Sequence, residues 1–426
     1  MMPKLYNRLL ILLILLSAGS MYFVLARNPM TLLLLLLVLI PYLSKERLKK
    51  VHVRACLLII PANILFLFTV YMFGYGNQSI EPYIYFCLVL VIGVLASSYL
   101  IYDVGYANTL SHVEKSLKII CYHALIAALL VPFFMPYMTP VSNEVSGWDG
   151  FTLFYLFFTS SGGQVFDFGI MIPRNRGLFW EPSVLQFFLN LYLYIQLFEK
   201  QKRNNTQILL VFIAIFTTYS TTGFLIMTGL FFMGYYSFLK SKPYYFPAIF
   251  AFMIVIVYLT FINVQLKFTE NVMSGMVRIY DLFQQWVVVM NNPLTGVGID
   301  VELYHRVRSM YPTPAWIEAL TGLSGIERGS ANSIMFLMGT TGIFYTLFII
   351  VGLLKQQFLT GNKIALYFLI FTSVSAAPIM LRPLFFTLIV SGWIYMLKTK
   401  QNKKIYEKRK NFNHWWSGIY RFKFNP

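Results

Sequence analysis

Charged residues are scarce in this chain of 426 residues: 12% of it is Asp, Glu, Lys or Arg, while 58% is hydrophobic. Soluble globular chains are about 25% charged, so a water-soluble protein of this length would lack its charged surface. Apolar runs long enough to cross a bilayer recur along the whole sequence. The composition therefore predicts an all-α polytopic membrane protein with about twelve transmembrane helices.

Metal-binding and disulfide patterns are also missing. The three cysteines, Cys56, Cys87 and Cys121, each fall inside an apolar run, where cysteine is typical of a small buried hydrophobe. Neither a zinc-ligand spacing nor a Walker loop is present. We therefore predict a protein without a metal or other cofactor.

The apolar runs divide the chain into helices and two long loops. We place spans at Leu9–Ala26, Met30–Ser44, Ala55–Gly74, Tyr83–Tyr102, Ile119–Met138, Pro182–Phe198, Ile208–Ser220, Thr222–Leu239, Tyr244–Asn263, Ala331–Leu354, Ile364–Leu381 and Leu384–Leu397. Residues 1–138 then form a bundle of five spans, 182–263 the central helices and 331–397 the last helices. The loops are 139–181 and 264–330, and 398–426 is a basic tail.

The positive-inside rule sets the orientation. Most lysines and arginines fall in segments that are cytoplasmic when both termini are cytoplasmic, including the Lys45–Arg54 cluster and the tail. The net charge of +18 is therefore a topology signal and an attraction to anionic lipid, and does not indicate nucleic-acid binding. Phe151–Met171 is apolar enough to cross, but Gly162-Gly163 interrupts it, so we expect a re-entrant or interfacial segment.

Arginine dominates the expected outer cations. With the exception of Lys267 they are all arginine: Arg27, Arg174, Arg176, Arg278, Arg306, Arg308, Arg328 and Arg382. Lysine predominates in the inner segments. Orientation needs charge alone, whereas arginine also offers a planar fork of donors that suits phosphate or carboxylate. The bias favours a phosphate-bearing ligand over loop salt bridges, although singly each arginine is more often structural.

The first long loop ends in a candidate site. Arg174 and Arg176 precede Glu181-Pro182, and Pro182 suits the first position of a helix, which makes Glu181 its N-cap. A carboxylate there is stabilised by the helix dipole. The structural interpretation is a cap and an Arg–Glu pair that order the loop; the functional one is a carboxylate beside two phosphate-binding arginines.

The second long loop holds most of the other outer polar residues. Helical periodicity from Val272 to Met290 predicts an amphipathic helix at the membrane surface, with Arg278, Asp281 and Gln285 on its polar face. The segment Asn292–Gly298 then forms a turn. Further candidates precede the next span, whose N-terminus is an anion site capped by Ser330 or Asn332: His305, Arg306, Arg308, Glu318, Glu327 and Arg328.

Four motifs in this order resemble the O-antigen polymerase (Wzy) family and its wider superfamily with O-antigen ligases. They are Arg174-Asn-Arg176-Gly177 before Glu181-Pro182, the turn Thr218–Gly223, the helix from Ser274 to Arg278 leading to Asn292–Gly298, and Asn332-Ser333 followed by Gly342-Ile343. The similarity in layout covers nearly the whole chain. This chain departs from the family pattern at Ala331, where His is frequent, at Thr340, where Glu is frequent, and at Thr221, where Arg is frequent.

The resemblance implies a GT-C-like glycosyltransferase in the bacterial inner membrane, with two large periplasmic loops. Its substrates would be undecaprenyl-diphosphate-linked oligosaccharides, and a chain-length regulator protein would be a further partner besides lipid. Diphosphate-binding candidates are Arg174, Arg176, Arg278, Arg306, Arg308, Arg328 and Asn332. Because Ala331 replaces the usual His, the catalytic base would be Glu181, Glu327 or His305, with Glu181 the first choice.

Two other functions remain open at this point. An O-antigen ligase would share the donor site but transfer the glycan to lipid A core. A flippase for lipid-linked glycans belongs to another class, and should have short outer loops and charges that line a central cavity. The charges of this chain lie in two long loops, which disfavours the flippase.

Overall fold

The computed structural model describes most of the chain. The described residues are 2–43, 50–143, 148–160, 164–165, 171–241, single positions between 244 and 265, 272–312, 315–321 and 332–398. The expected span Tyr244–Asn263 and the tail 398–426 therefore lie almost wholly outside them.

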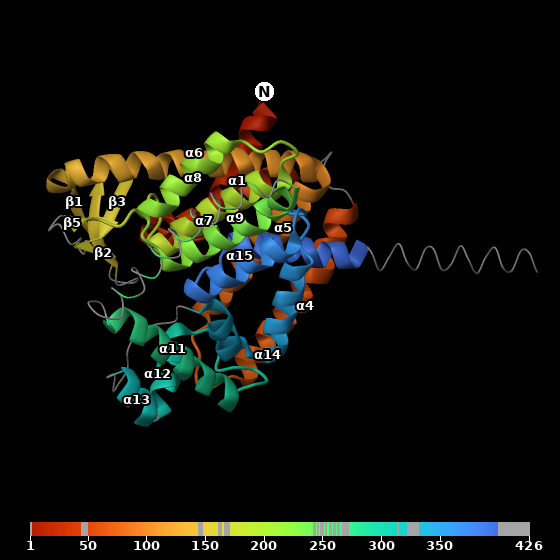
Figure 1. The fold of residues 1–426 in the computed structure, drawn as a ribbon. Coiled ribbons are helices and arrows are strands. Elements are labelled where there is room, and N and C mark those ends of the chain that lie inside the picture. The colour runs from red at the N-terminus through yellow and green to blue at the C-terminus, as the bar shows by residue number, and fades with distance from the viewer. Residues whose placement is uncertain are drawn as a thin grey trace, which may run out of the picture.

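Helices make up most of the described chain (Figure 1). The first half contains α1 (Met2–Leu16), α2 (Met21–Leu25), α3 (Arg27–Leu43), α4 (Lys50–Phe73), α5 (Glu81–Tyr99), the π-helix η2 (Leu100–Val104), α6 (Tyr106–Phe134) and the 3-10 turn η3 (Met135–Tyr137). The second half contains α7 (Pro182–Tyr194), the π-helix η4 (Ile195–Glu199), α8 (Asn205–Thr217), α9 (Thr221–Ser241), α11 (Val272–Asn291), α12 (Val301–Met310), α13 (Ala315–Thr321), α14 (Ser333–Leu354), α15 (Lys363–Ala376) and a last helix, Pro383–Lys398.

The helices have the composition of a membrane protein. Among the described residues, four are long and apolar enough to cross a bilayer: Val53–Phe73, Glu81–Val104, Tyr106–Tyr137 and Ser333–Leu354. Four further apolar helices are shorter: Arg27–Leu43, Asn205–Thr217, Lys363–Ala376 and Pro383–Lys398. Exposed Leu57, Leu65, Phe68 and Met72 on α4 show a surface suited to lipid rather than water.

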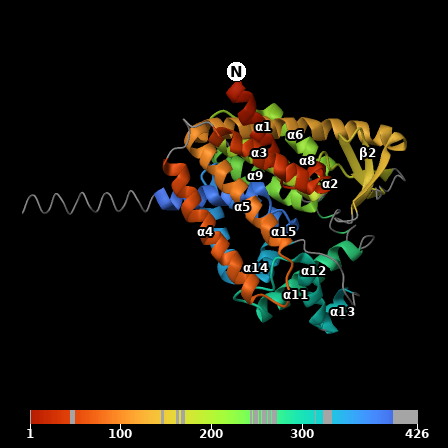
Figure 2. The same ribbon diagram turned by 180° about the vertical axis from the view of Figure 1, so that it is seen from behind.

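The first predicted span is broken in the middle. A helix over Leu9–Ala26 was expected, but α1 ends at Leu16 and α2 begins at Met21. Gly19 between them has φ +128°, a backbone conformation that favours glycine. This break lies against the loop before α7, as described below. Figure 2 shows α1, α2 and α3 from behind, beside α5.

Short β-strands form in the segment that we expected to be re-entrant or interfacial. β1 (Thr139–Asn143), β2 (Trp148–Leu153) and β3 (Phe157–Ser160) form an antiparallel sheet in that order, and β4 (Gln164–Val165) pairs with β5 (Met171–Ile172). The backbones of β2 and β3 pair with one another, so the described residues 151–160 of the apolar run are not helical. The three-stranded sheet continues the end of α6 (Figure 1).

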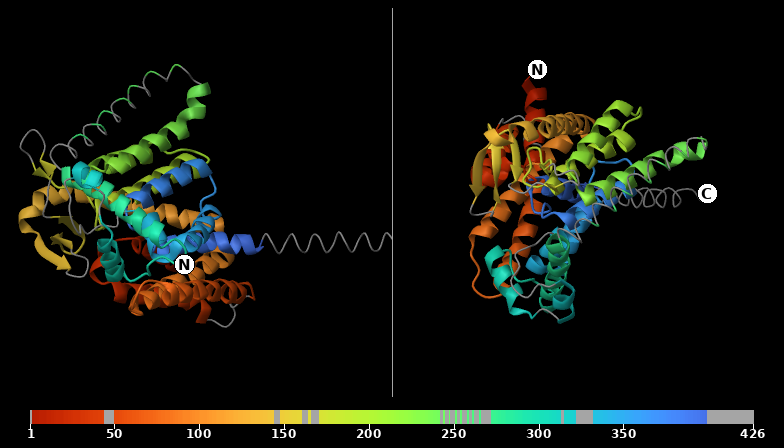
Figure 3. Two further views of the ribbon diagram at one scale, coloured as in Figure 1. Left: turned by 90° about the horizontal axis from the view of Figure 1, so that it is seen from below. Right: turned by 60° about the vertical axis from the view of Figure 1, so that its left-hand side comes forward.

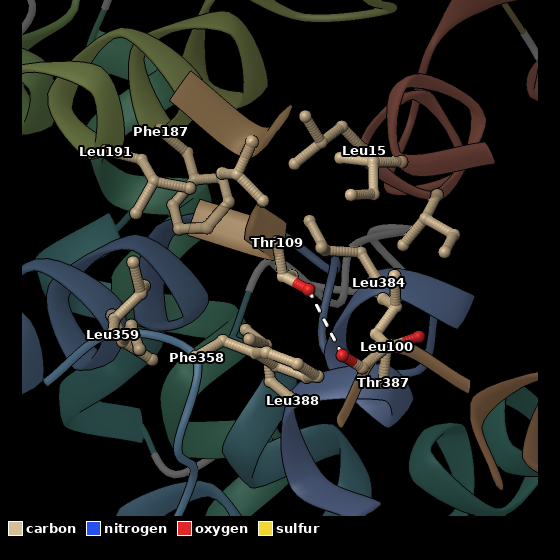
Figure 4. A pocket seen from close by; sticks show the side chains of 14 residues that line it. Leu15, Leu100, Thr109, Phe187, Leu191, Phe358, Leu359, Leu384, Thr387 and Leu388 are labelled. Atoms are coloured by element: carbon tan, nitrogen blue, oxygen red, sulfur yellow. Dashed lines mark hydrogen bonds between the residues drawn. The ribbon is translucent and has the colours of Figure 1, made fainter. Parts of the chain in front are cut away.

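α7 is the centre of the bundle. Every residue from Pro182 to Tyr194 is buried, and α6, α8, α9 and α15 pack around it. One face of α7 lines an apolar pocket together with α1, α6, α15 and the last helix, including Leu15, Phe187 and Leu384 (Figure 4). Within that pocket the Thr109 hydroxyl donates to the Leu100 carbonyl at 3.2 Å, so its polar groups are satisfied locally.

Loops that the sequence places outside contact one another in pairs, and we call the end of the bundle where the loop 173–181 lies the outer end. Ser20 forms a β-bridge with Phe179, the Tyr75 amide donates to the Val297 carbonyl, and the Ser333 hydroxyl donates to the Ala377 carbonyl. Loops expected inside also meet: the Gly361 amide donates to Glu199. α11–α13 lie together at the edge of the molecule, and α11 packs against α14 (Figures 1 and 3).

Candidate functional site

The loop 173–181 enters the interior of the outer end. Asn175 anchors it: the side-chain amide donates to the Ala124 carbonyl of α6 and to the Thr217 hydroxyl of α8, both at 2.8 Å. Its Oδ1 accepts from the Gly177 amide, and Gly177 has φ +52°. Asn175 is 7% exposed, so these bonds satisfy a buried polar side chain. Asn175 was not among the predicted site residues, and it fixes the two arginines that flank it.

Arg174 caps the end of α8. Its guanidinium donates to the Thr218 carbonyl at 3.3 Å and to the Tyr219 carbonyl at 3.1 Å. The last carbonyls of a helix have no partner within the helix, and a cation there also interacts favourably with the dipole. Tyr219 has φ +47°, an uncommon conformation for a bulky residue. The structure thus joins two of the motifs, the Arg174–Glu181 loop and the Thr218–Gly223 turn.

Arg176 is a buried cation beside Glu181. It is 6% exposed, and its Nη1 donates to the Trp180 carbonyl at 3.0 Å. Burial lowers the pKa of Arg176 to about 10, while Glu181 raises this pKa and Arg174 lowers it further. The guanidinium therefore stays protonated at neutral pH. Glu181 and Arg174 each lie close enough to Arg176 for their charges to act on it.

Glu181 occupies the predicted N-cap of α7, which confirms the helix start at Pro182. Its carbonyl accepts from the amides of Val184 and Leu185, but its carboxylate does not cap the backbone. Instead the carboxylate accepts a hydrogen bond from the Ser183 hydroxyl at 2.6 Å. The side chain is half-buried and stays free of the helix backbone, so it is available to a ligand at the outer end.

A polar seam continues from Glu181 down α7. The Gln186 amide donates to the Ser183 carbonyl at 2.9 Å, and the Asn190 amide donates to Gln186 Oε1 at 3.0 Å and to the Gly223 carbonyl at 3.2 Å. Gln186 and Asn190 are fully buried. Their spacing places them on one face of the helix, toward the start of α9. Ser183, Gln186 and Asn190 were missed because single polar residues in an apolar run give no distinct sequence signal.

The loop also pairs with the break between α1 and α2. The Met21 amide donates to the Leu178 carbonyl at 2.7 Å, and the Trp180 amide donates to the Gly19 carbonyl at 3.2 Å. A Cβ on Gly19 would lie 3.0 Å from the Trp180 ring. Backbone that leaves a helix needs such partners inside a membrane protein. The break therefore holds Trp180 and Glu181 in place.

A second group of predicted residues lies on α12. Arg308 is 2% exposed and its Nη1 lies 3.2 Å from Oδ1 of Asp281 on α11. Tyr304, one turn earlier, is fully buried, and burial raises the pKa of its hydroxyl. His305 is half-buried with its ring 5.9 Å from that of Tyr304, and Arg306 is exposed. The structure therefore assigns Arg308 an internal ion pair and leaves Arg306 on the surface.

α11 presents its polar face inward. Asp281, Gln284 and Gln285 are buried, whereas Leu282, Trp286 and Met290 are 46%, 48% and 60% exposed. This is the reverse of a helix packed on a water-soluble domain, and it suits an apolar solvent outside. The predicted amphipathic helix is present, and its polar residues contact protein instead of water.

The glycine motifs of α11 and α14 meet directly. α14 is interrupted at Gly342, which has φ 80° and ψ 170°. The segment Asn292–Gly298 fills the interruption: the Val297 and Gly298 amides donate to the carbonyls of Gly339 and Thr340 at 2.8 and 2.9 Å, and the Ile343 amide donates to Pro293 at 2.9 Å. A Cβ on Gly296 would lie 2.5 Å from the Thr340 backbone, and one on Gly342 would overlap the Leu294 carbonyl.

The remaining predicted residues fall at several places. Asn332 caps α14, because its Oδ1 accepts from the amides of Ile334 and Met335 at 3.1 Å. Arg278 lies in α11, but its side chain is outside the described residues, as are Glu327 and Arg328. Figure 1 shows α12 well separated from the start of α7, so the described candidates form two groups.

The part of the chain that the structure describes contains no group of three or more His, Cys, Asp or Glu that could hold a metal ion. Comparisons with family models, with curated proteins and with solved structures give no match. The site must therefore be interpreted from its own residues. Those residues offer fixed arginines and the half-buried carboxylate of Glu181 at the outer end of a helix bundle.

Proposed function

We propose that this protein is a polysaccharide polymerase that joins undecaprenyl-diphosphate-linked repeat units at the periplasmic face of the bacterial inner membrane. The observation that carries the proposal is the loop Arg174–Glu181, in which two arginines and a carboxylate are held together at the outer end of a fully buried helix. The pairing of the motif segments, 174 with 218–219 and 292–298 with 339–343, supports it further.

The proposal includes a topology of about twelve spans with both termini cytoplasmic. The distribution of lysine and arginine supports this orientation. The contacts among the outer loops agree with it, since 19–21, 174–180 and 217–219 meet at one end of the bundle. The remaining spans, and the side on which each loop lies, are part of the proposal.

The proposed reaction is a glycosyl transfer. A hydroxyl oxygen of one lipid-linked repeat unit attacks the anomeric carbon of the growing chain, and a bond forms between them. The bond from that carbon to the diphosphate oxygen breaks, so undecaprenyl diphosphate leaves with the electron pair. The hydroxyl proton passes to a base. Negative charge develops on the diphosphate, and fixed cations stabilise such charge best when they need no reorganisation.

The described residues suit these roles as follows. Arg176 is fixed by burial and by the Trp180 carbonyl, and it remains protonated at neutral pH. Glu181 and His305 are the candidate bases that the structure describes, and Glu181 stays the first choice because its half-buried carboxylate accepts from the Ser183 hydroxyl at 2.6 Å beside Arg176. Arg174 supports the site by holding the Thr218–Tyr219 turn against the loop.

The test is the length of glycan chains on a gel after Arg176→Gln and Glu181→Gln are introduced separately in the native host. The proposal predicts stable, inserted protein and glycan limited to a single repeat. Polymer that forms but stays on its lipid carrier would favour a ligase-type transferase. Long chains in both variants would rule out this site, and a flippase would then be the next hypothesis.

A further inference from the structure

Arg27 and Arg382, two of the arginines expected on the outer side, lie outside the two long loops and contact the same tyrosine. The guanidinium carbon of Arg27 lies 3.6 Å from the centroid of the Tyr85 ring. The side chain of Arg382 reaches the hydroxyl of the same tyrosine, as does Thr31. Arg27 and Arg382 also lie close enough for their charges to repel one another. Three segments far apart in the sequence therefore build one dicationic cluster, which we call the Tyr85 cluster (Arg27, Thr31, Tyr85 and Arg382).

Helix starts surround this cluster. Arg27 is the first residue of α3, and the carbonyl of Arg382 accepts from the Phe386 amide at the start of the helix Pro383–Lys398. Tyr85 lies in the second turn of α5. The N-terminal end of a helix carries partial positive charge. The helix ends thus add to the positive potential of the two arginines.

The positive charge of the cluster has no nearby carboxylate among the described residues. No Asp or Glu oxygen in that part of the chain lies within 4 Å of either guanidinium. Glu81, one turn before Tyr85, is exposed. Burial lowers the pKa of Arg382, and Arg27 lowers it further while Tyr85 raises it. Two like charges held together cost free energy that a bound anion would offset.

The cluster is open to a ligand. Arg27 is exposed, and Tyr85 and Arg382 are half-buried, so the site has an accessible side and a fixed floor. The guanidinium groups and the Tyr85 hydroxyl are all hydrogen-bond donors, which matches an anion with several acceptor oxygens. α2 connects this cluster to the loop Arg174–Glu181, since Met21 pairs with Leu178 and α3 begins soon after.

We propose that Arg27, Arg382 and Tyr85 bind the diphosphate group of a lipid-linked molecule at the outer membrane surface. This assignment rests on the proposed function, in which two lipid-linked diphosphates must be held at once. The loop Arg174–Glu181 would hold one and the Tyr85 cluster the other. Neither Arg27 nor Arg382 belongs to the motifs discussed above, and their partner Tyr85 lies in an apolar helix.

The experiment measures binding of a short polyprenyl diphosphate and of inorganic diphosphate to the purified full-length chain in detergent micelles, by calorimetric titration. The variants are Arg27→Gln, Arg382→Gln and Tyr85→Phe, which keeps the ring under Arg27. Arg54→Gln is the matched control, since Arg54 is an exposed arginine near the start of α4, a helix that carries no residue of the Tyr85 cluster. Thermal unfolding of each unliganded variant is measured in parallel.

The proposal predicts that each arginine variant weakens binding of the polyprenyl diphosphate about 10- to 100-fold, while Arg54→Gln leaves it unchanged. It also predicts that Arg382→Gln keeps or raises the melting temperature without ligand, because a like-charge repulsion is removed. A purely structural role would lower that temperature instead. If inorganic diphosphate binds as tightly as the polyprenyl diphosphate, and through the same arginines, the cluster is an anion site but the proposal that its ligand is lipid-linked is wrong.

Unchanged affinity in both arginine variants would overturn the site itself. That outcome is distinct from failure of the proposed function, which is measured by glycan chain length. If wild-type protein makes polymer and the variants bind normally, only this inference fails. If wild-type protein binds the probe through Arg27 and Arg382 but makes no polymer, the site stands and the proposed reaction fails.

Discussion

The ion pair between Asp281 and Arg308 allows a test of whether Arg308 stabilises the fold or binds the substrate. The side chains are 5% and 3% exposed and their charged atoms lie 3.2 Å apart. At an effective dielectric constant near 20, the attraction at that distance is about 5 kcal/mol before desolvation is subtracted. Removal of one partner leaves a buried charge uncompensated and costs about 3–5 kcal/mol. Arg308→Met alone and Asp281→Leu alone should therefore each lower the melting temperature markedly.

The double variant Asp281→Leu/Arg308→Met gives the decisive comparison. Replacing both partners of a buried pair with apolar residues is often neutral or stabilising. If Arg308 acts only through Asp281, the double variant should recover both the melting temperature in detergent and the glycan chain length. The reasoning is refuted if the double variant is as unstable as the single ones. If the double variant is stable but makes no polymer, Arg308 has a role beyond the ion pair, and diphosphate binding is again its predicted role.

Three further predictions concern other parts of the molecule. Glu181→Gln should reduce glycosyl transfer at least about 100-fold with an unchanged melting temperature, whereas Ser183→Ala should reduce it less than about 10-fold, as measured by single-turnover product formation. Gly342→Ala should prevent recovery of folded protein, because a Cβ would overlap the Leu294 carbonyl. Gly76→Ala is the control: Gly76 also has a positive φ, +61°, but no atom lies near its Cβ position, so this variant should fold. Size-exclusion profiles measure the folded fraction of both variants. Trp286→Glu should lower membrane-extracted yield, because a charge in contact with lipid costs about 2–3 kcal/mol; an unchanged yield would place α11 in water.

Most helices could be predicted from the sequence because their apolar runs are long and uninterrupted. α3, α4, α5 and α7 begin and end within a few residues of the expected spans. The break after Leu16 was missed, since its cause is the pairing of Gly19 with Trp180 far along the chain. Hydrophobic periodicity reports a local preference and carries no information about such a partner.

The β-strands were missed for a different physical reason. The turn between β2 and β3 places Phe154 and Tyr155 at φ 54° and 55°, a conformation usually supplied by Gly, Asn or Asp. Bulky aromatic residues there give no hairpin signal, and the run around them is continuously apolar. Strand pairing with β1 decides the outcome, and it depends on segments outside any local window.

The candidate site could be predicted in part. The N-cap position of Glu181 follows from Pro182, and it is confirmed. The roles of Arg174 and Arg308 could not be read locally, because their partners, the Thr218 carbonyl and Asp281, lie at distant positions. The Tyr85 cluster was missed because Arg27 and Arg382 are separated by nearly the whole chain.

The most direct test of the central claim uses purified protein in proteoliposomes that contain a single undecaprenyl-diphosphate-linked repeat unit. The measurement is mass spectrometry of the lipids over time. We predict lipid-linked dimers and longer products, with one molecule of undecaprenyl diphosphate released for each linkage formed. Intact substrate that is moved between leaflets, with no free undecaprenyl diphosphate and no lengthened glycan, would contradict it.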